Sequence, residues 1–162
     1  MTQQTLSIQP RTTYAGLQIT AQLAIIRESS DVEMKTPDSI NEACDDLRQL
    51  TQETFITFTL DAKNNVIGRH LISLGIVDAT LIHPREVFRP ALIDGAAAII
   101  CAHNHPSGDP TPSTDDIKIT RQLVEAGKII GINILDHVII GRPSEANREG
   151  FLSLRESGIV SF

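Results

Sequence analysis

Residues 96–102 constrain the fold most strongly, because their sequence, AAAIICA, is an unbroken apolar run. A short run of this kind predicts a central strand that is covered by protein on both faces. The run continues into His-Asn-His at positions 103–105, and residues 106–112, PSGDPTP, follow with three prolines and a glycine. Such a segment is not regular structure. The sequence therefore predicts a buried strand whose polar end opens into a rigid loop.

The rest of the chain predicts helices and strands on both sides of this run. Helical spacing and capping residues predict helices over residues 38–50, 84–94 and 113–130. The first would be capped by Ser39, and the second would be kinked at Pro90 and ended by Gly95. Apolar and β-branched runs predict strands over 54–60, from 66 onward, and over 78–82, 132–140 and 151–154. This order implies an α/β fold with a mixed β-sheet flanked by helices.

The chain has the length of one domain, with 162 residues of which 41% are hydrophobic. We interpret residues 1–36, rich in Thr, Gln and Ser, as an N-terminal arm or extension, and residues 37–162 as the domain. The 14 Lys and Arg residues are outnumbered by 20 Asp and Glu, which leaves a net charge of -6. An acidic chain has no overall positive electrostatic field that would attract a phosphate backbone, so nucleic acid is disfavoured as a partner.

Cysteine usage and the N-terminus indicate the compartment. Cys44 and Cys101 form no CxxC pair, which excludes a disulfide framework and a Cys-rich zinc site and fits a reducing environment. The N-terminus, MTQQTLSIQPRTT, lacks the basic start and apolar core of a signal peptide, and no stretch approaches 18 uninterrupted apolar residues. We therefore expect a cytoplasmic protein with no membrane association.

The two neighbouring histidines are the first candidates for chemistry. Positions i and i+2 of a strand point to the same face, so His103 and His105 can aim two imidazoles at one point. Asp116 lies in the first turn of the following helix and can fold back over the strand end. Two imidazoles and a carboxylate leave a fourth tetrahedral position for water, as in catalytic zinc sites. The alternatives are a hydrogen-bonded histidine pair and a helix cap formed by Ser113 and Asp116; the cap is compatible with metal binding.

The spacing of these residues resembles a known motif. His103, His105, Ser113 and Asp116 have the H-x-H-x7-S-x2-D spacing of the JAMM (MPN+) metalloprotease motif. The wording HNHPSGDPTPS is similar to the RadC family of bacteria, and the resemblance covers roughly residues 36–160. It implies the JAB/MPN fold, whose sheet is related to that of the cytidine deaminases. Longer RadC proteins also carry an N-terminal helix-hairpin-helix region, so the chain resembles a short RadC-like form.

The resemblance implies a zinc-dependent peptidase or isopeptidase that acts on a peptide or protein substrate. Its Zn²⁺ would be held by His103, His105 and Asp116, and a bound water would attack an amide carbonyl. Ser113 would donate a hydrogen bond to the oxyanion. Glu53 occupies the position of the family's distant glutamate and would be the general base. The alternative for Glu53 is a solvated charge at a helix end.

Glu86 is the rival candidate for the base. Its place at the start of a helix, beside Arg85, favours instead a stabilising interaction with the helix dipole or with that arginine.

Other polar residues have structural interpretations. Cys101 is expected to be a small buried hydrophobe, and His70 and His83 to be ordinary histidines. His137 is either a hydrogen-bonded support for the site or a satisfied core histidine. Asn104 points to the face opposite its neighbours and is expected to hold the loop.

Two further functional classes would need other residues. A zinc deaminase would need His-x-Glu followed by Pro-Cys-x-x-Cys, and the sequence has neither. The serious alternative is a non-enzymatic or DNA-associated module linked to DNA repair, for which a local basic patch would be needed. Basic residues such as Arg85, Arg89 and Arg142 could form such a patch.

Overall fold

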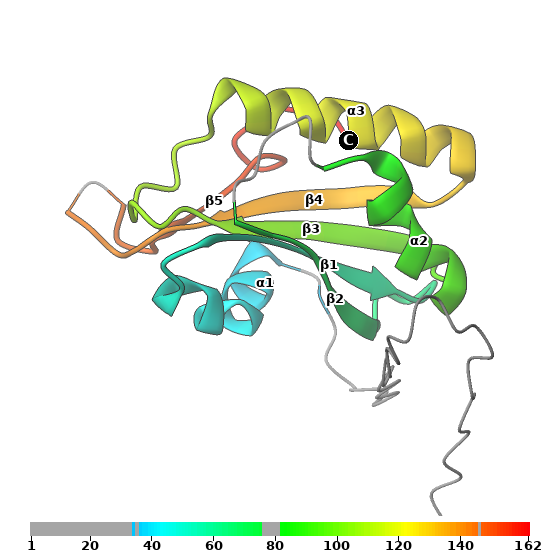
Figure 1. Ribbon diagram of the computed structural model, residues 1–162, viewed down its shortest axis with the longest axis horizontal. Helices are drawn as coiled ribbons and strands as arrows, with labels where there is room; N and C mark the ends of the chain where they lie inside the picture. The colour runs from blue at the N-terminus through cyan, green and yellow to red at the C-terminus, as the bar shows by residue number, and fades with distance from the viewer. Residues whose placement is uncertain (1–33, 35, 76–81, 146) are drawn as a thin grey trace, which may run out of the picture.

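The computed structural model describes residues 34, 36–75, 82–145 and 147–162 of the chain (Figure 1). A five-stranded sheet in the order β2-β1-β3-β4-β5 forms its centre. The strands are β1 (Glu53–Leu60), β2 (Val66–Gly75), β3 (Ala98–Asn104), β4 (Asn133–Ile140) and β5 (Phe151–Ser153). The β3–β4 pair is parallel and the other three pairs are antiparallel, so the sheet is mixed.

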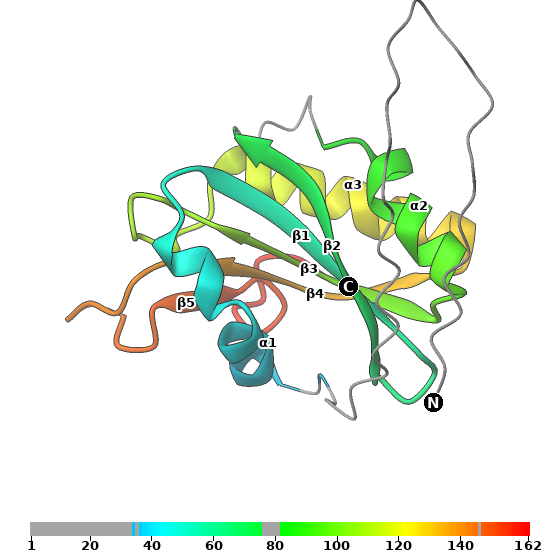
Figure 2. The ribbon, with the colours of Figure 1, turned by 60° about the horizontal axis from the view of Figure 1, so that its bottom comes forward.

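Helices cover both faces of this sheet. In Figure 1, α2 (Pro84–Asp94) and α3 (Thr114–Ile130) lie above it, whereas α1 (Pro37–Ala43) and the 3-10 helix η1 (Asp45–Gln49) lie below. Figure 2 shows the same separation from another side. The predicted α/β fold with helices flanking a mixed sheet is confirmed.

The apolar run of residues 96–102 provides most of β3, the middle strand of the sheet. All seven residues of β3 are buried, from Ala98 to Asn104. The β3–α3 loop leads into α3, which begins after Ser113 and ends at Gly131. Gly131 adopts a left-handed conformation with a φ of 81°, which favours glycine at a helix end. The predicted helix after Ser113 is therefore confirmed, as is the one ended by Gly95.

The prediction of one helix over residues 38–50 is wrong. Thr36, not Ser39, is the cap, and Ser39 occupies the third helical position and bonds back to Thr36. Pro37 supplies a favourable first residue. The α-helix ends at Ala43, and the chain continues as η1, which carries Arg48. Its guanidinium donates to the Asn41 side chain and to the carbonyls of Gly141 and Gly150.

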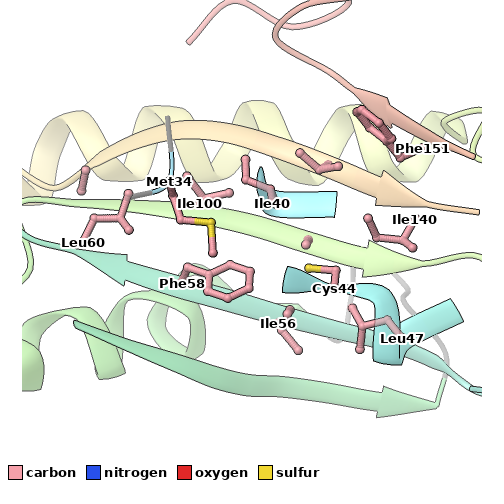
Figure 3. Close-up of a cluster of buried hydrophobic side chains, with 13 residues drawn as sticks. Met34, Ile40, Cys44, Leu47, Ile56, Phe58, Leu60, Ile100, Ile140 and Phe151 are labelled. Atoms are coloured by element: carbon pink, nitrogen blue, oxygen red, sulfur yellow. The ribbon is translucent and has the colours of Figure 1, made fainter. Parts of the chain in front are cut away.

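Each face of the sheet has its own apolar core. On the α1 face, Figure 3 shows Ile56 and Phe58 of β1 beside Ile100 of β3, with Cys44 and Leu47 packed onto them. On the other face, Phe55, Ile99 and Cys101 pack with residues of α2 and α3. Neighbouring residues of β1 and β3 thus alternate between two cores, as expected for strands covered on both sides.

Some predictions concern residues outside the described ranges. The strand expected over 78–82 lies there except for Ile82, and so does most of the N-terminal extension over 1–36. Of that extension, Met34 is buried in the α1-face core and Thr36 caps α1. Among the helices that the structure describes, none combines the length and the apolar character required to cross a membrane.

Candidate metal centre

The sheet register brings the candidate residues of β1 and β3 to one edge. Phe55 of β1 pairs with His103 of β3 in the antiparallel ladder, so the start of β1 lies beside the end of β3. Glu53 precedes Phe55 by two positions and therefore projects from the same face. The β3–α3 loop then returns the chain across this edge, where the first turn of α3 supplies Asp116.

Four side chains converge there. One ligand atom from each of Glu53, His103, His105 and Asp116 lies within 4.8 Å of every other. The Nε2 atoms of His103 and His105 are 3.0 Å apart. The distance from His103 Nε2 to Asp116 Oδ1 is 3.2 Å, and the distance from His105 Nε2 to Asp116 Oδ2 is 3.4 Å. Glu53 Oε1 is 3.8 Å from both Nε2 atoms.

These separations fit a small tetrahedral cation. Atoms bound to zinc at 2.0–2.1 Å in tetrahedral geometry lie about 3.3 Å from one another. The three separations among His103, His105 and Asp116 run from 3.0 to 3.4 Å. Glu53 is somewhat farther from the two imidazoles. The distance to His103 is measured from Asp116 Oδ1 and the distance to His105 from Asp116 Oδ2, so the two imidazoles and the carboxylate converge on one small volume, with the Glu53 carboxylate beside it.

The surroundings of His105 leave one of its nitrogens available. Its Nδ1 is 2.7 Å from the carbonyl of Asp109, which can only accept a hydrogen bond. Nδ1 therefore carries a proton, and Nε2 faces the cluster. Burial lowers the pKa of His105, but the hydrogen bonds to Asp116 and to the Asp109 carbonyl outweigh it, and the net pKa is raised above 6.5. A proton and a metal ion would compete for this Nε2 atom.

Asp116 is oriented by the helix that carries it. Ser113 donates to Asp116 Oδ2 from both its backbone N–H and its hydroxyl, each at 2.7 Å, and accepts from the Asp116 N–H in return. The predicted cap is thus confirmed. Burial raises the pKa of Asp116, but the hydrogen bonds from His103, His105 and Ser113 prevail and hold that pKa well below its usual range. The carboxylate is therefore ionised and available to a cation.

The cluster is buried on one side and open on the other. His103 is completely buried and the side chain of Asp116 is 2% exposed, whereas the side chains of His105 and Glu53 are 15% and 22% exposed. Phe55 stacks on the His103 ring at 6.0 Å between centroids and holds it in place. A small molecule would reach the cluster from the side of Glu53 and His105.

The other candidates from the sequence lie away from this cluster. Glu86 is in the first turn of α2 and pairs with Arg85 and Arg89, as its position at a helix start indicated. Cys101 is completely buried in an apolar cluster, and burial raises the pKa of its thiol.

The two histidines taken as ordinary have structural partners. His83 caps α2 by accepting from the Arg85 N–H. His70 pairs with Asp94 at 2.7 Å.

Asn104 holds the start of β1 rather than the loop after β3. Its side chain accepts from the Thr54 N–H at 2.8 Å and donates to the carbonyls of Gln52 and Leu50. These bonds flank Glu53 in the sequence. They therefore set the position of Glu53 relative to the histidines on β3.

We expect Asn104→Ala to destabilise the fold, because the buried Thr54 N–H would lose its acceptor. Such a loss costs about 1–3 kcal/mol. Asn104→Asp keeps the acceptor but buries a carboxylate against the carbonyls of Gln52 and Leu50, so it should be destabilised as well. Urea denaturation of the two variants beside the unchanged protein measures the difference, and equal stabilities of Asn104→Ala and the unchanged protein would contradict this role.

Two residues behind His103 complete the site. His137 Nε2 is 2.8 Å from His103 Nδ1, and His137 Nδ1 is 2.6 Å from the Thr120 hydroxyl. His137 therefore acts as a hydrogen-bonded support for the site, which was one of the two interpretations of this residue. Burial lowers the pKa of His137 well below its ordinary value. Thr120 was not predicted from the sequence, although a polar residue one turn after Asp116 on a buried helix face was an available signal.

The mixed sheet and the four-residue cluster at its edge define an α/β domain with a candidate metal centre of the JAB type. The chain matches the family described as RadC-like JAB domain over residues 34–159 and belongs to that family.

Several curated bacterial proteins are similar to the chain. A UPF0758 protein of Bacillus pumilus is 45% identical over 128 residues, which are 78% of this chain and 54% of that protein. UPF0758 protein BH3032 of Halalkalibacterium halodurans is 40% identical over 149 residues, 91% of this chain and 62% of the relative. UPF0758 protein lmo1549 of Listeria monocytogenes is 43% identical over 145 residues, which are 89% of this chain and 62% of that protein. The chain thus spans between half and two thirds of these relatives.

Proposed function

We propose that this protein is a zinc-dependent amide hydrolase of the metallopeptidase or isopeptidase type. One observation carries the proposal: two imidazoles and one carboxylate converge with nitrogen and oxygen atoms 3.0 to 3.4 Å apart, and Glu53 lies beside them. His103, His105 and Asp116 would hold the ion. When bound, zinc would act as a Lewis acid toward the scissile carbonyl and would lower the pKa of a water molecule to about 7.

Glu53 would transfer the proton in this reaction. Its carboxylate lies at the open side of the cluster, 3.8 Å from both imidazole Nε2 atoms. It would accept a proton from the attacking water and return it to the departing amine, which is general base and then general acid catalysis. Glu86 would take no part, because it lies on α2 and pairs with two arginines.

Ser113 would have two roles in succession. Its hydroxyl donates to Asp116 Oδ2 and so orients that carboxylate. Donation to the oxyanion, the role implied by the family resemblance, requires the hydroxyl to exchange this bond for one to substrate. We retain that role as part of the proposal, with a substrate amide in a peptide or on a lysine side chain.

The test compares metal-free protein with zinc-loaded protein on a fluorogenic peptide library and on a lysine-linked isopeptide. We expect hydrolysis of at least one class only with zinc, its loss on chelation, and its return on adding zinc. Zinc-loaded protein that cleaves neither class would overturn the proposed activity.

The three arginines considered for association with DNA have partners within the described part of the chain. Arg85 and Arg89 pair with Glu86, and Arg142 donates to the carbonyl of Pro106. DNA association therefore stays a prediction. A salt titration of DNA binding tests it, because contacts to phosphates weaken steeply as salt rises.

A reducing compartment such as the cytoplasm is the proposed location. Cys44 and Cys101 are free thiols and are both buried. Burial raises the pKa of Cys44 to about 12, and it raises the pKa of Cys101 as well. Neither thiol is therefore a reactive nucleophile.

A further inference from the structure

A chain of hydrogen bonds runs from the backbone of one proposed ligand to the ring of another. Thr120 lies one turn after Asp116 on α3, and its hydroxyl is 2.6 Å from the Asp116 carbonyl. The same hydroxyl is 2.6 Å from His137 Nδ1 on β4, and His137 Nε2 is 2.8 Å from His103 Nδ1 on β3. The chain thus links three elements around the back of the cluster.

The chemistry of the first acceptor sets the direction of every bond in this chain. A carbonyl only accepts, so the Thr120 hydroxyl must give its one proton to Asp116. The hydroxyl oxygen then accepts from His137, which places the imidazole proton of His137 on Nδ1. His137 is completely buried, where a charged imidazole would be costly, so its Nε2 carries no proton.

The proton position on His137 also determines the proton position on His103. Because His137 Nε2 is an acceptor, His103 Nδ1 must be the donor and carries the proton. A neutral His103 then has a bare Nε2, the atom that faces His105 and Asp116. Only a bare imidazole nitrogen can bind a metal ion.

We propose that Thr120 and His137 are positioning residues that keep the proton of His103 on Nδ1 and so prepare Nε2 for the metal. This inference rests on the metal site of the proposed function. It assigns a role to two residues that do not touch the cluster's open side. His105 reaches the same proton arrangement by a shorter route, through the Asp109 carbonyl.

The first test changes only the hydroxyl of Thr120. Thr120→Val removes it at similar volume, whereas Thr120→Ser retains it. We expect Thr120→Val to weaken zinc binding by about 10- to 100-fold, the usual effect of losing a group that orients a metal ligand. Thr120→Ser should bind within about threefold of the unchanged protein. Competition with a chromophoric chelator gives the zinc affinities.

Thr57 provides a matched control. It is also a buried threonine, and its hydroxyl has no hydrogen-bond partner in the described part of the chain. Thr57→Val should leave zinc affinity unchanged. Equal affinities of Thr120→Val and the unchanged protein would overturn the proposal, and so would a loss in Thr57→Val as large as that in Thr120→Val.

A second measurement needs no variant. In metal-free protein, ¹⁵N–¹H correlation spectra of the histidine rings distinguish a proton on Nδ1 from one on Nε2. We expect a proton on Nδ1 of both His103 and His137, and a His103 Nδ1 that carries no proton would overturn the proposal. Failure of the unchanged protein to bind zinc would contradict the proposed function, while these spectra would still decide the proton arrangement.

Discussion

Glu53→Gln should abolish amide hydrolysis and leave zinc binding intact. The amide of glutamine is nearly the size of the carboxylate but cannot take up a proton. Positioned general bases contribute about 10²- to 10⁴-fold to rate, so a loss of this size is expected. Glu53 Oε1 is 3.8 Å from the Nε2 atoms of both imidazoles. This distance is 0.4 to 0.8 Å longer than the 3.0 to 3.4 Å distances among His103, His105 and Asp116.

Glu86→Gln is the matched control for this measurement. Glu86 is another glutamate near the start of an element, but its carboxylate pairs with Arg85 and Arg89. The two variants are compared by their steady-state rates on the most rapidly cleaved peptide. Zinc content is measured on the same samples. A lost rate in Glu86→Gln with full activity in Glu53→Gln would show that the base is misassigned.

Zinc should raise the thermal stability of the protein by a large amount. A ligand that binds only the folded state stabilises it by about 4 kcal/mol when present at a thousand times its Kd. For a chain of this size, that corresponds to a rise in Tm on the order of 10 °C. His105→Ala should lose most of this rise. Its side chain is only partly buried, so the metal-free variant should still fold.

His83→Ala serves as the control, because it removes an imidazole that caps α2 and lies outside the cluster. Its Tm should fall in the absence of zinc through loss of the cap, and the rise on adding zinc should be unchanged. Differential scanning calorimetry at equal protein concentrations measures both quantities. An equal rise in His105→Ala and in the unchanged protein would place the zinc elsewhere.

The parts of the site that depend on local rules were predictable from the sequence. Strand alternation places His103 and His105 on one face, and the spacing of Ser113 and Asp116 predicts a helix cap. Both rules act over a few residues and need no knowledge of the rest of the fold. The structure brings His103, His105 and Asp116 together at one edge of the sheet with Glu53, which the family resemblance rather than a local rule had indicated.

The parts that depend on packing between distant segments were not predictable. Arg48, in the 3-10 helix that replaces the second half of the predicted helix, bonds to carbonyls about a hundred positions later, a contact that no local pattern records. The contact between Thr120 and His137 depends on how α3 lies against β4. Helical spacing identified the buried face of α3 but not the residue opposite each position.

The zinc content of the purified protein tests the central claim most directly. We expect about one zinc ion per chain in the unchanged protein after equilibration with zinc and removal of the excess. His103→Ala and Asp116→Ala should hold almost none, with circular dichroism confirming that each variant is folded. Equal and negligible zinc in all three proteins would contradict the assignment of His103, His105 and Asp116 as metal ligands.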